Sequence, residues 1–180
     1  MVPRSLVLAA ALSCLVASAA KAQSFGIGVG GAAVNDTGTA SNVKGFQNGE
    51  GHAFVEMVME PGVALQLRGM FFTVPGTAAD SPKVRGSAAL VSVGYQFREE
   101  WFRAGFFAGG GLYRMNPRDP EPDQTASDVK EDVFGWHGGV LTTFRLAPAW
   151  DLRLEASVHS IRTGVSHAPI FIGGSIGYSF

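Results

Sequence analysis

Every second residue in one stretch near the C-terminal end of the sequence carries a group that could do chemistry. These residues supply a cation, a carboxylate, a hydroxyl and an imidazole: Arg153, Glu155, Ser157 and His159. In an extended strand, alternate residues point to the same side. A hydroxyl, an imidazole and a carboxylate are also the parts of an acyl-transfer triad. However, Glu155 is two residues from Ser157 rather than beside His159, and it is more simply an ion-pair partner. We therefore expect no catalytic residue here.

His137 offers a second possibility for chemistry, because it lies on the preceding alternating segment. One permitted register pairs Arg145 with Asp151 and also pairs His137 with His159. Two imidazoles could bind a metal or respond to pH. No thiol or third ligand accompanies them, so we expect two hydrogen-bonded histidines, with no metal and no cofactor.

The composition suits a single domain that is poor in charge. The chain has 180 residues, 24 of them glycine, and only 16% are charged, against about 25% in typical soluble domains. Mean hydropathy is +0.16. The formal net charge of −1 gives no reason to expect a nucleic-acid partner.

The N-terminus has the pattern of an export signal. Arg4 precedes an apolar run from Leu6 to Val16, and Ala20-Lys21-Ala22 provides an A-x-A cleavage site. We expect residues 1–22 to be removed, together with the only cysteine, Cys14. No later run of about 20 apolar residues is present, which excludes helical spans. A closed barrel is the other structure that satisfies every backbone group in lipid.

Residues 23–180 show the pattern expected of such a barrel. They contain eight segments in which apolar residues alternate with small or polar ones. The opposite face carries mainly Gly, Ser and Ala with scattered charges, too few for a wet exterior. Short and long connections also alternate, as in membrane barrels. We predict an all-β, eight-stranded, antiparallel up-and-down transmembrane β-barrel with its apolar face toward lipid and these strands: 25–34, 52–60, 63–74, 87–97, 102–115, 133–145, 152–162 and 170–180.

The last segment carries a family resemblance. Its even positions carry Ile170, Ile172, Ile176, Tyr178 and a terminal Phe180, and from Gly173 onward its odd positions carry only Gly and Ser. This ending resembles the small OmpA/OmpX-type, porin-like barrels of the bacterial outer membrane. The resemblance implies an exported, monomeric outer-membrane protein that contacts lipid and lipopolysaccharide. It also implies that the barrel-insertion machinery reads Ile176, Tyr178 and Phe180.

The inward face should hold a polar network. A three-residue turn after Glu60 would place Glu56 opposite Arg68, and because buried charges must be paired, we expect an ion pair. Similar counting places Gln96 opposite Arg103. An eight-stranded barrel is just wide enough for side chains to fill it, so packing is favoured over a gated plug. The expected members are Glu56, Gln66, Arg68, Gln96, Arg103, His137, Arg153, Glu155 and His159.

The sequence favours a structural or surface-interaction role, with 35–51 and 116–132 as loops that could bind an extracellular ligand. Two alternatives remain open. A lipid A-modifying enzyme of the deacylase kind would carry a His-x-Ser motif, whereas this chain has Ser157-Val158-His159. A narrow solute or ion channel is the other alternative.

Overall fold

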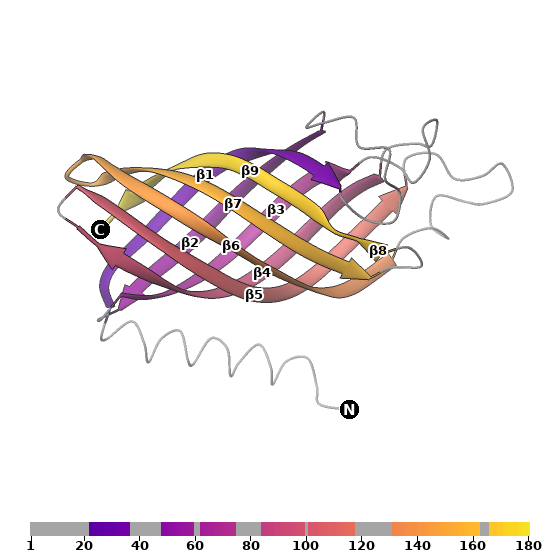
Figure 1. Cartoon of the computed structure of the whole chain (residues 1–180), viewed down its shortest axis with the longest axis horizontal. Coiled ribbons are helices and arrows are strands. Elements are labelled where there is room, and N and C mark those ends of the chain that lie inside the picture. Colours follow the sequence, from indigo (N-terminus) through magenta and orange to yellow (C-terminus); the bar gives the residue numbers. More distant parts are fainter. Residues whose placement is uncertain are drawn as a thin grey trace, which may run out of the picture.

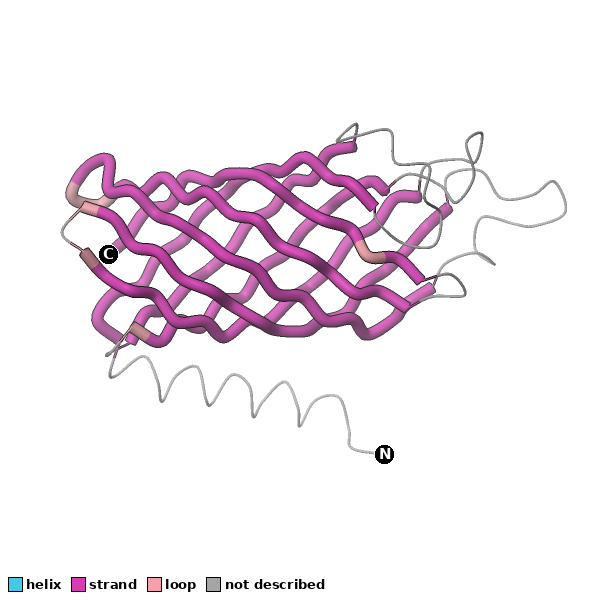
Figure 2. The backbone as a smooth tube through the Cα atoms, viewed as in Figure 1, coloured by secondary structure: helices cyan, strands magenta, loops and turns pink. Residues whose placement is uncertain are grey.

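A computed structural model describes residues 22–36, 48–59, 62–74, 84–99, 101–117, 131–162 and 166–180, and these are almost entirely strand (Figure 2). Among them, no helix is long and apolar enough to cross a membrane. The expected signal segment lies outside the described residues, apart from Ala22. The strands are β1 (Ala22–Asp36), β2 (Asn48–Met59), β3 (Val63–Val74), β4 (Val84–Arg98), β5 (Phe102–Pro117), β6 (Glu131–Ala147), β7 (Trp150–Arg162), β8 (Ser166–His167) and β9 (Pro169–Ser179).

The strands form one closed antiparallel ring (Figure 1). The sheet order is β6-β5-β4-β3-β2-β1-β9-β7-β8, and β6 also pairs with β7. β8 and β9 both pair with β7 in one continuous register, so they are a single final run interrupted at Ala168. The first and last strands are joined along their length, and Phe180 N donates to Phe25 O at 2.8 Å. The predicted eight-stranded antiparallel barrel is confirmed.

The apolar face of the strands points outward. Phe71 is 75% exposed, whereas the next residue, Phe72, is 4% exposed. The same alternation recurs around the ring, which leaves large apolar side chains on the exterior, among them Val29, Leu67, Val93, Phe106, Trp136, Val140, Leu154 and Ile176. Such a surface is suited to acyl chains rather than to water.

The two ends of the barrel differ. The turn end carries the short connections between β2 and β3, β4 and β5, and β6 and β7, together with the C-terminus (Figure 1). At the β2–β3 turn, Gly62 N donates to Met59 O at 2.7 Å, and Gly62 has a φ of 116°, which a residue with a side chain rarely adopts. The loop end is the opposite one, where the strands are joined by 37–47, 75–83, 118–130 and 163–165.

The strands at the loop end extend further than the sequence predicts. β1 continues to Asp36 and β2 begins at Asn48, so both take residues from the predicted loop 35–51. In the same way, β5 and β6 take the ends of 116–132. The remaining parts of these loops lie outside the described residues.

Aromatic side chains gather on the exterior at the turn end. Tyr178 lies between Trp150 and Phe180, with ring centroids 5.2 Å and 5.1 Å away. Tyr95 and Phe97 form a similar pair at 5.1 Å. Membrane barrels carry such a girdle where the bilayer meets water.

The lumen contains an apolar cluster near the loop end, which we call the apolar plug: Val34, Met70, Phe72, Val74, Ala88, Leu90, Tyr113, Met115, Ile161 and Phe171. None of these residues is more than 9% exposed. The expected polar lumen of small residues and paired charges therefore also contains an apolar cluster. At the loop ends of β1, β3 and β5 the inward positions carry large apolar residues, Val34, Phe72, Val74, Tyr113 and Met115.

Some glycines make room for aromatic rings inside the barrel. A Cβ on Gly86 would lie 2.3 Å from the ring of Phe72, and one on Gly28 would lie 2.4 Å from the ring of Phe54. Each ring therefore lies directly over a glycine on the neighbouring strand. This arrangement lets large rings fill a narrow lumen.

Candidate functional site

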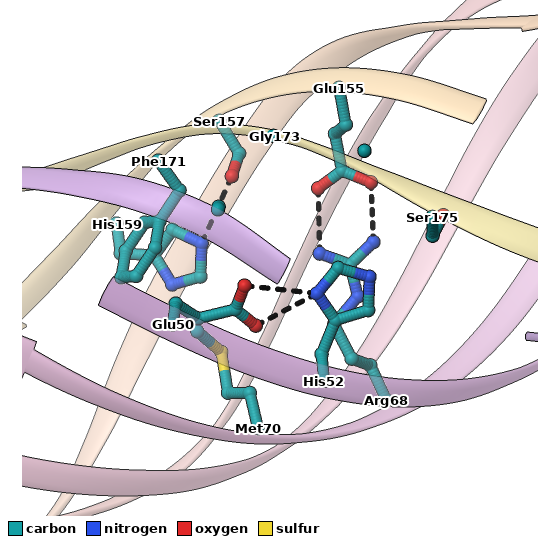
Figure 3. Close-up of a pocket in the computed structure, with 12 residues that line it drawn as sticks. Glu50, His52, Arg68, Met70, Glu155, Ser157, His159, Phe171, Gly173 and Ser175 are labelled. Atoms are coloured by element: carbon teal, nitrogen blue, oxygen red, sulfur yellow. Dashed lines mark hydrogen bonds and ion pairs between the residues drawn. The ribbon is translucent and has the colours of Figure 1, made fainter. Parts of the chain in front are cut away.

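Three ion pairs link strands across the polar part of the lumen. Arg153 donates to Glu56 at 2.5 Å, and Arg103 donates to Asp151 at 2.5 Å. The third pair is bidentate, since Arg68 uses both Nη atoms to reach the two oxygens of Glu155 at 2.6 and 2.5 Å (Figure 3). The side chains in these pairs are at most 12% exposed. Each buried charge therefore has an opposite charge beside it, as burial requires.

The predicted Glu56–Arg68 pair is wrong. Glu56 lies opposite Gln66 instead. The pair next to the turn is Met59–Val63, whereas the prediction placed Glu60 opposite Ala64. The observed pair therefore lies one residue earlier on both strands. The shift of two residues keeps both charges inward but changes their partners. Arg68 reaches Glu155 on β7 instead.

The predicted pairing of Gln96 with Arg103 is also wrong. Gln96 lies opposite Gly105, and Arg103 lies opposite Arg98. Gln96 Nε2 donates to Glu56 at 3.3 Å. Both side chains remain in the lumen, on the face that the alternation predicts.

The two histidines lie opposite each other on β6 and β7, in the register that also pairs Arg145 with Asp151. Their ring centroids are 5.2 Å apart. Ser92 Oγ lies 2.7 Å from His137 Nε2, and Tyr113 Oη lies 2.8 Å from His159 Nδ1, so each histidine has a hydrogen-bond partner. In the described part of the chain, no group of three or more His, Cys, Asp or Glu side chains could hold a metal ion.

Ser157 and His159 are close, but they are enclosed. Ser157 Oγ lies 3.3 Å from His159 Nε2, and the two residues are 3% and 1% exposed (Figure 3). The carboxylate of Glu155 is bound to Arg68 rather than to the imidazole. His159 is oriented by Tyr113, so this geometry has no carboxylate in the third place of a hydrolytic triad.

Glu50 and His52 form a buried pair that the sequence reasoning missed. His52 Nδ1 lies 2.9 and 3.0 Å from the two carboxylate oxygens of Glu50, and the side chains are 6% and 2% exposed for His52 and Glu50. Both residues continue the inward alternation of β2. Extending that alternation back to Asn48 would have found Glu50, which the predicted loop boundary excluded.

The lumen has little free space. A cavity lined by Glu50, His52, Arg68 and Glu155, among others, measures about 10 Å³ (Figure 3). Two further lumen cavities, beside Arg103 and beside Gln66, measure about 20 and 10 Å³. A volume of this size holds about one water molecule. The described lumen is therefore filled by its own side chains.

The comparisons with known proteins agree with this architecture. The family model described as the outer membrane protein beta-barrel domain matches residues 7–180. No curated protein is similar enough in sequence to count as a match.

Solved structures share the fold at low sequence identity. Neisserial surface protein A is 10% identical, with a TM-score of 0.69 over 87% of this chain and 97% of that one. Ail, the attachment invasion locus protein of Yersinia pestis, in complex with the heparin analogue sucrose octasulfate, is 13% identical, with a TM-score of 0.56 over 87% and 98%. The N-terminal β-barrel domain of Pseudomonas aeruginosa OprF is 11% identical, with a TM-score of 0.55 over 88% and 98%.

The family model covers nearly the whole sequence, and the closed ring with an apolar exterior is the structure that this family requires. The chain belongs to the outer membrane protein β-barrel domain family, whose place is the bacterial outer membrane.

Proposed function

We propose that this chain is a surface-interaction protein of the outer membrane, whose barrel is a rigid platform for the loops 35–51 and 116–132. The observation that carries the proposal is the filled lumen: ion pairs occupy one part and the apolar plug occupies the other. A barrel filled in this way leaves its loops as the parts with room to bind a partner.

The packing near the loop end supports the platform role. Val34, Val74 and Met115 lie at or within two residues of the ends of β1, β3 and β5, and each is at most 3% exposed. Burial of such a side chain contributes roughly 1.5–3 kcal/mol. The strand ends from which the loops emerge are therefore held by the plug.

The charge of the loop 116–132 favours a basic partner. This stretch has six acidic residues, Asp119, Glu121, Asp123, Asp128, Glu131 and Asp132, against Arg118 and Lys130. Like charge disfavours a polyanion at such a surface. The heparin analogue bound by Ail is therefore not the chemistry that we propose for this loop.

Adhesion of intact cells that make the chain tests this proposal. We expect them to adhere to an immobilised basic protein, lysozyme, more than to immobilised heparin. Replacing the four acidic residues at 119, 121, 123 and 128 by their amides should abolish the difference, since these residues supply most of the negative charge. A matched control is Glu99→Gln, at the turn end. Equal adhesion to lysozyme with and without the chain would contradict the proposal.

The remaining partners follow from the membrane setting. We propose that the barrel is a monomer in contact with lipid and lipopolysaccharide, and that Ile176, Tyr178 and Phe180 form the insertion signal. Supporting this, Ile176 and Phe180 are 50% and 70% exposed on the exterior. A chain with Phe180→Ala should insert more slowly than the wild-type chain into vesicles that contain the insertion machinery. Equal insertion of the wild-type chain with and without that machinery would contradict the proposed signal.

A further inference from the structure

The apolar plug reaches across the lumen but has no member on β2, where the inward residues Glu50 and His52 lie opposite Phe72 and Met70. Its members come from β1, β3, β4, β5, β7 and β9, and Val133 of β6 packs against them. The Phe72 ring meets Phe171 edge-on, with centroids 5.6 Å apart and an angle of 88°. It also meets Tyr113 at 6.4 Å and 75°. Since neither β9 nor β5 is next to β3 in the sheet, these contacts join strands that do not pair.

The three arginine–carboxylate ion pairs of the described lumen lie on the turn side of this cluster, whereas the Glu50–His52 pair lies at the level of the cluster itself. Arg103 and Asp151 are close to the short turns, Glu56 and Arg153 follow, and Arg68 with Glu155 lies nearest the plug. Water and ions interact favourably with such side chains. The small cavities beside them are lined by both polar and apolar side chains.

The apolar plug presents a different environment to an ion. Its side chains offer no charged partner, and transfer of an ion into an apolar region without a partner is strongly unfavourable. Hydrophobic constrictions in pores exclude ions because water leaves them. The packed rings and aliphatic side chains of the apolar plug form a barrier of the same kind.

We propose that the apolar plug, rather than the network of ion pairs, closes this barrel to water and ions. The ion pairs neutralise the charges on the wall of the lumen, and the plug forms the seal. This closure is independent of whatever the loops bind, so failure of the adhesion experiment leaves it unaffected.

Planar-bilayer recordings of the refolded full barrel test the seal. The wild-type chain should show no discrete openings. The double variant Phe72→Ala, Phe171→Ala should show openings, because it removes both rings of the cross-lumen contact. The matched control is Phe71→Ala, which removes an aromatic ring from the same strand on the lipid side and should stay silent.

A charge variant separates the plug from the ion pairs. Arg68→Gln with Glu155→Gln removes one pair while keeping the lumen electrically balanced, and it should stay silent. Heat-dependent mobility in gels verifies that each variant is folded. If the double alanine variant does not fold, Leu90→Asn replaces it. This variant makes the plug polar at similar volume and should also show openings. Openings in the wild type or the charge variant, or silence of a folded plug variant, would overturn the proposal.

Discussion

At the scale of single residues, the choice of ion-pair partners is the most informative feature. Glu56 and Arg68 lie on neighbouring strands, yet each pairs with a residue of β7, Arg153 and Glu155 respectively. Arg153 also lies over the ring of Phe54, 4.6 Å from its centroid. The lumen is narrow enough that a long side chain reaches across it as easily as along the wall.

Removal of one charge should therefore affect one particular partner. Glu56→Ala should lower the free energy of unfolding by about 3–5 kcal/mol, because it leaves Arg153 buried without its counter-ion. In double-mutant cycles measured by urea unfolding in vesicles, the coupling between positions 56 and 153 should exceed that between 56 and 68. A larger coupling between 56 and 68 would contradict the structure.

The aromatic rings over glycine give a second prediction at this scale. Gly86→Ala should destabilise the barrel by about 1–3 kcal/mol, because the new methyl group overlaps the ring of Phe72. Phe72→Leu in the same chain should recover part of the loss. The control is Gly69→Ala, where a Cβ has no heavy atom within 4 Å. Similar unfolding curves for the two alanine variants would argue against the overlap.

At the scale of elements, the face of each strand was predictable but the register of two hairpins was not. Alternation has a period of two, so sliding β3 along β2 by two residues leaves every side chain on the same face. The hydrophobic pattern therefore could not separate the predicted register from the observed one. The β6–β7 hairpin was less ambiguous, because one register paired Arg145 with Asp151 and His137 with His159, and the structure has both pairs.

Paired cysteines distinguish the two registers of the β2–β3 hairpin. Val55 lies directly opposite Leu67, so Val55→Cys with Leu67→Cys should form a disulfide, since partners across a ladder lie within bonding range. Val55→Cys with Gly69→Cys, which the predicted register would favour, should form much less. Non-reducing mass spectrometry of the folded protein measures both, and the reverse ranking would restore the predicted register.

At the scale of the whole molecule, closure between β1 and β9 makes the barrel. Val29 lies opposite Ile176 at this junction, and both residues face outward. A sheet left open here would expose unpaired backbone groups to lipid, which is costly. The chain therefore folds as a ring rather than as a sheet that could add further strands.

A disulfide across this junction should stabilise the whole barrel. Val29→Cys with Ile176→Cys should cross-link and raise the free energy of unfolding by roughly 4–5 kcal/mol in the absence of strain, because it closes nearly the entire chain into a loop. Val29→Cys with Val158→Cys, on strands that do not pair, is the control. Absence of the first cross-link in folded protein, detected by gel mobility without reductant, would mean that the ring is open.

The sequence by itself determined the number of strands, the outward apolar face and the alternation of short and long connections, because these follow from local periodicity. It also placed Glu56, Arg68, Arg153 and His159 on the inner face. Only the tertiary structure decided which charges pair and where the apolar plug lies. Those outcomes depend on the stagger of the strands and on contacts across the lumen, and a pattern that repeats every two residues contains neither.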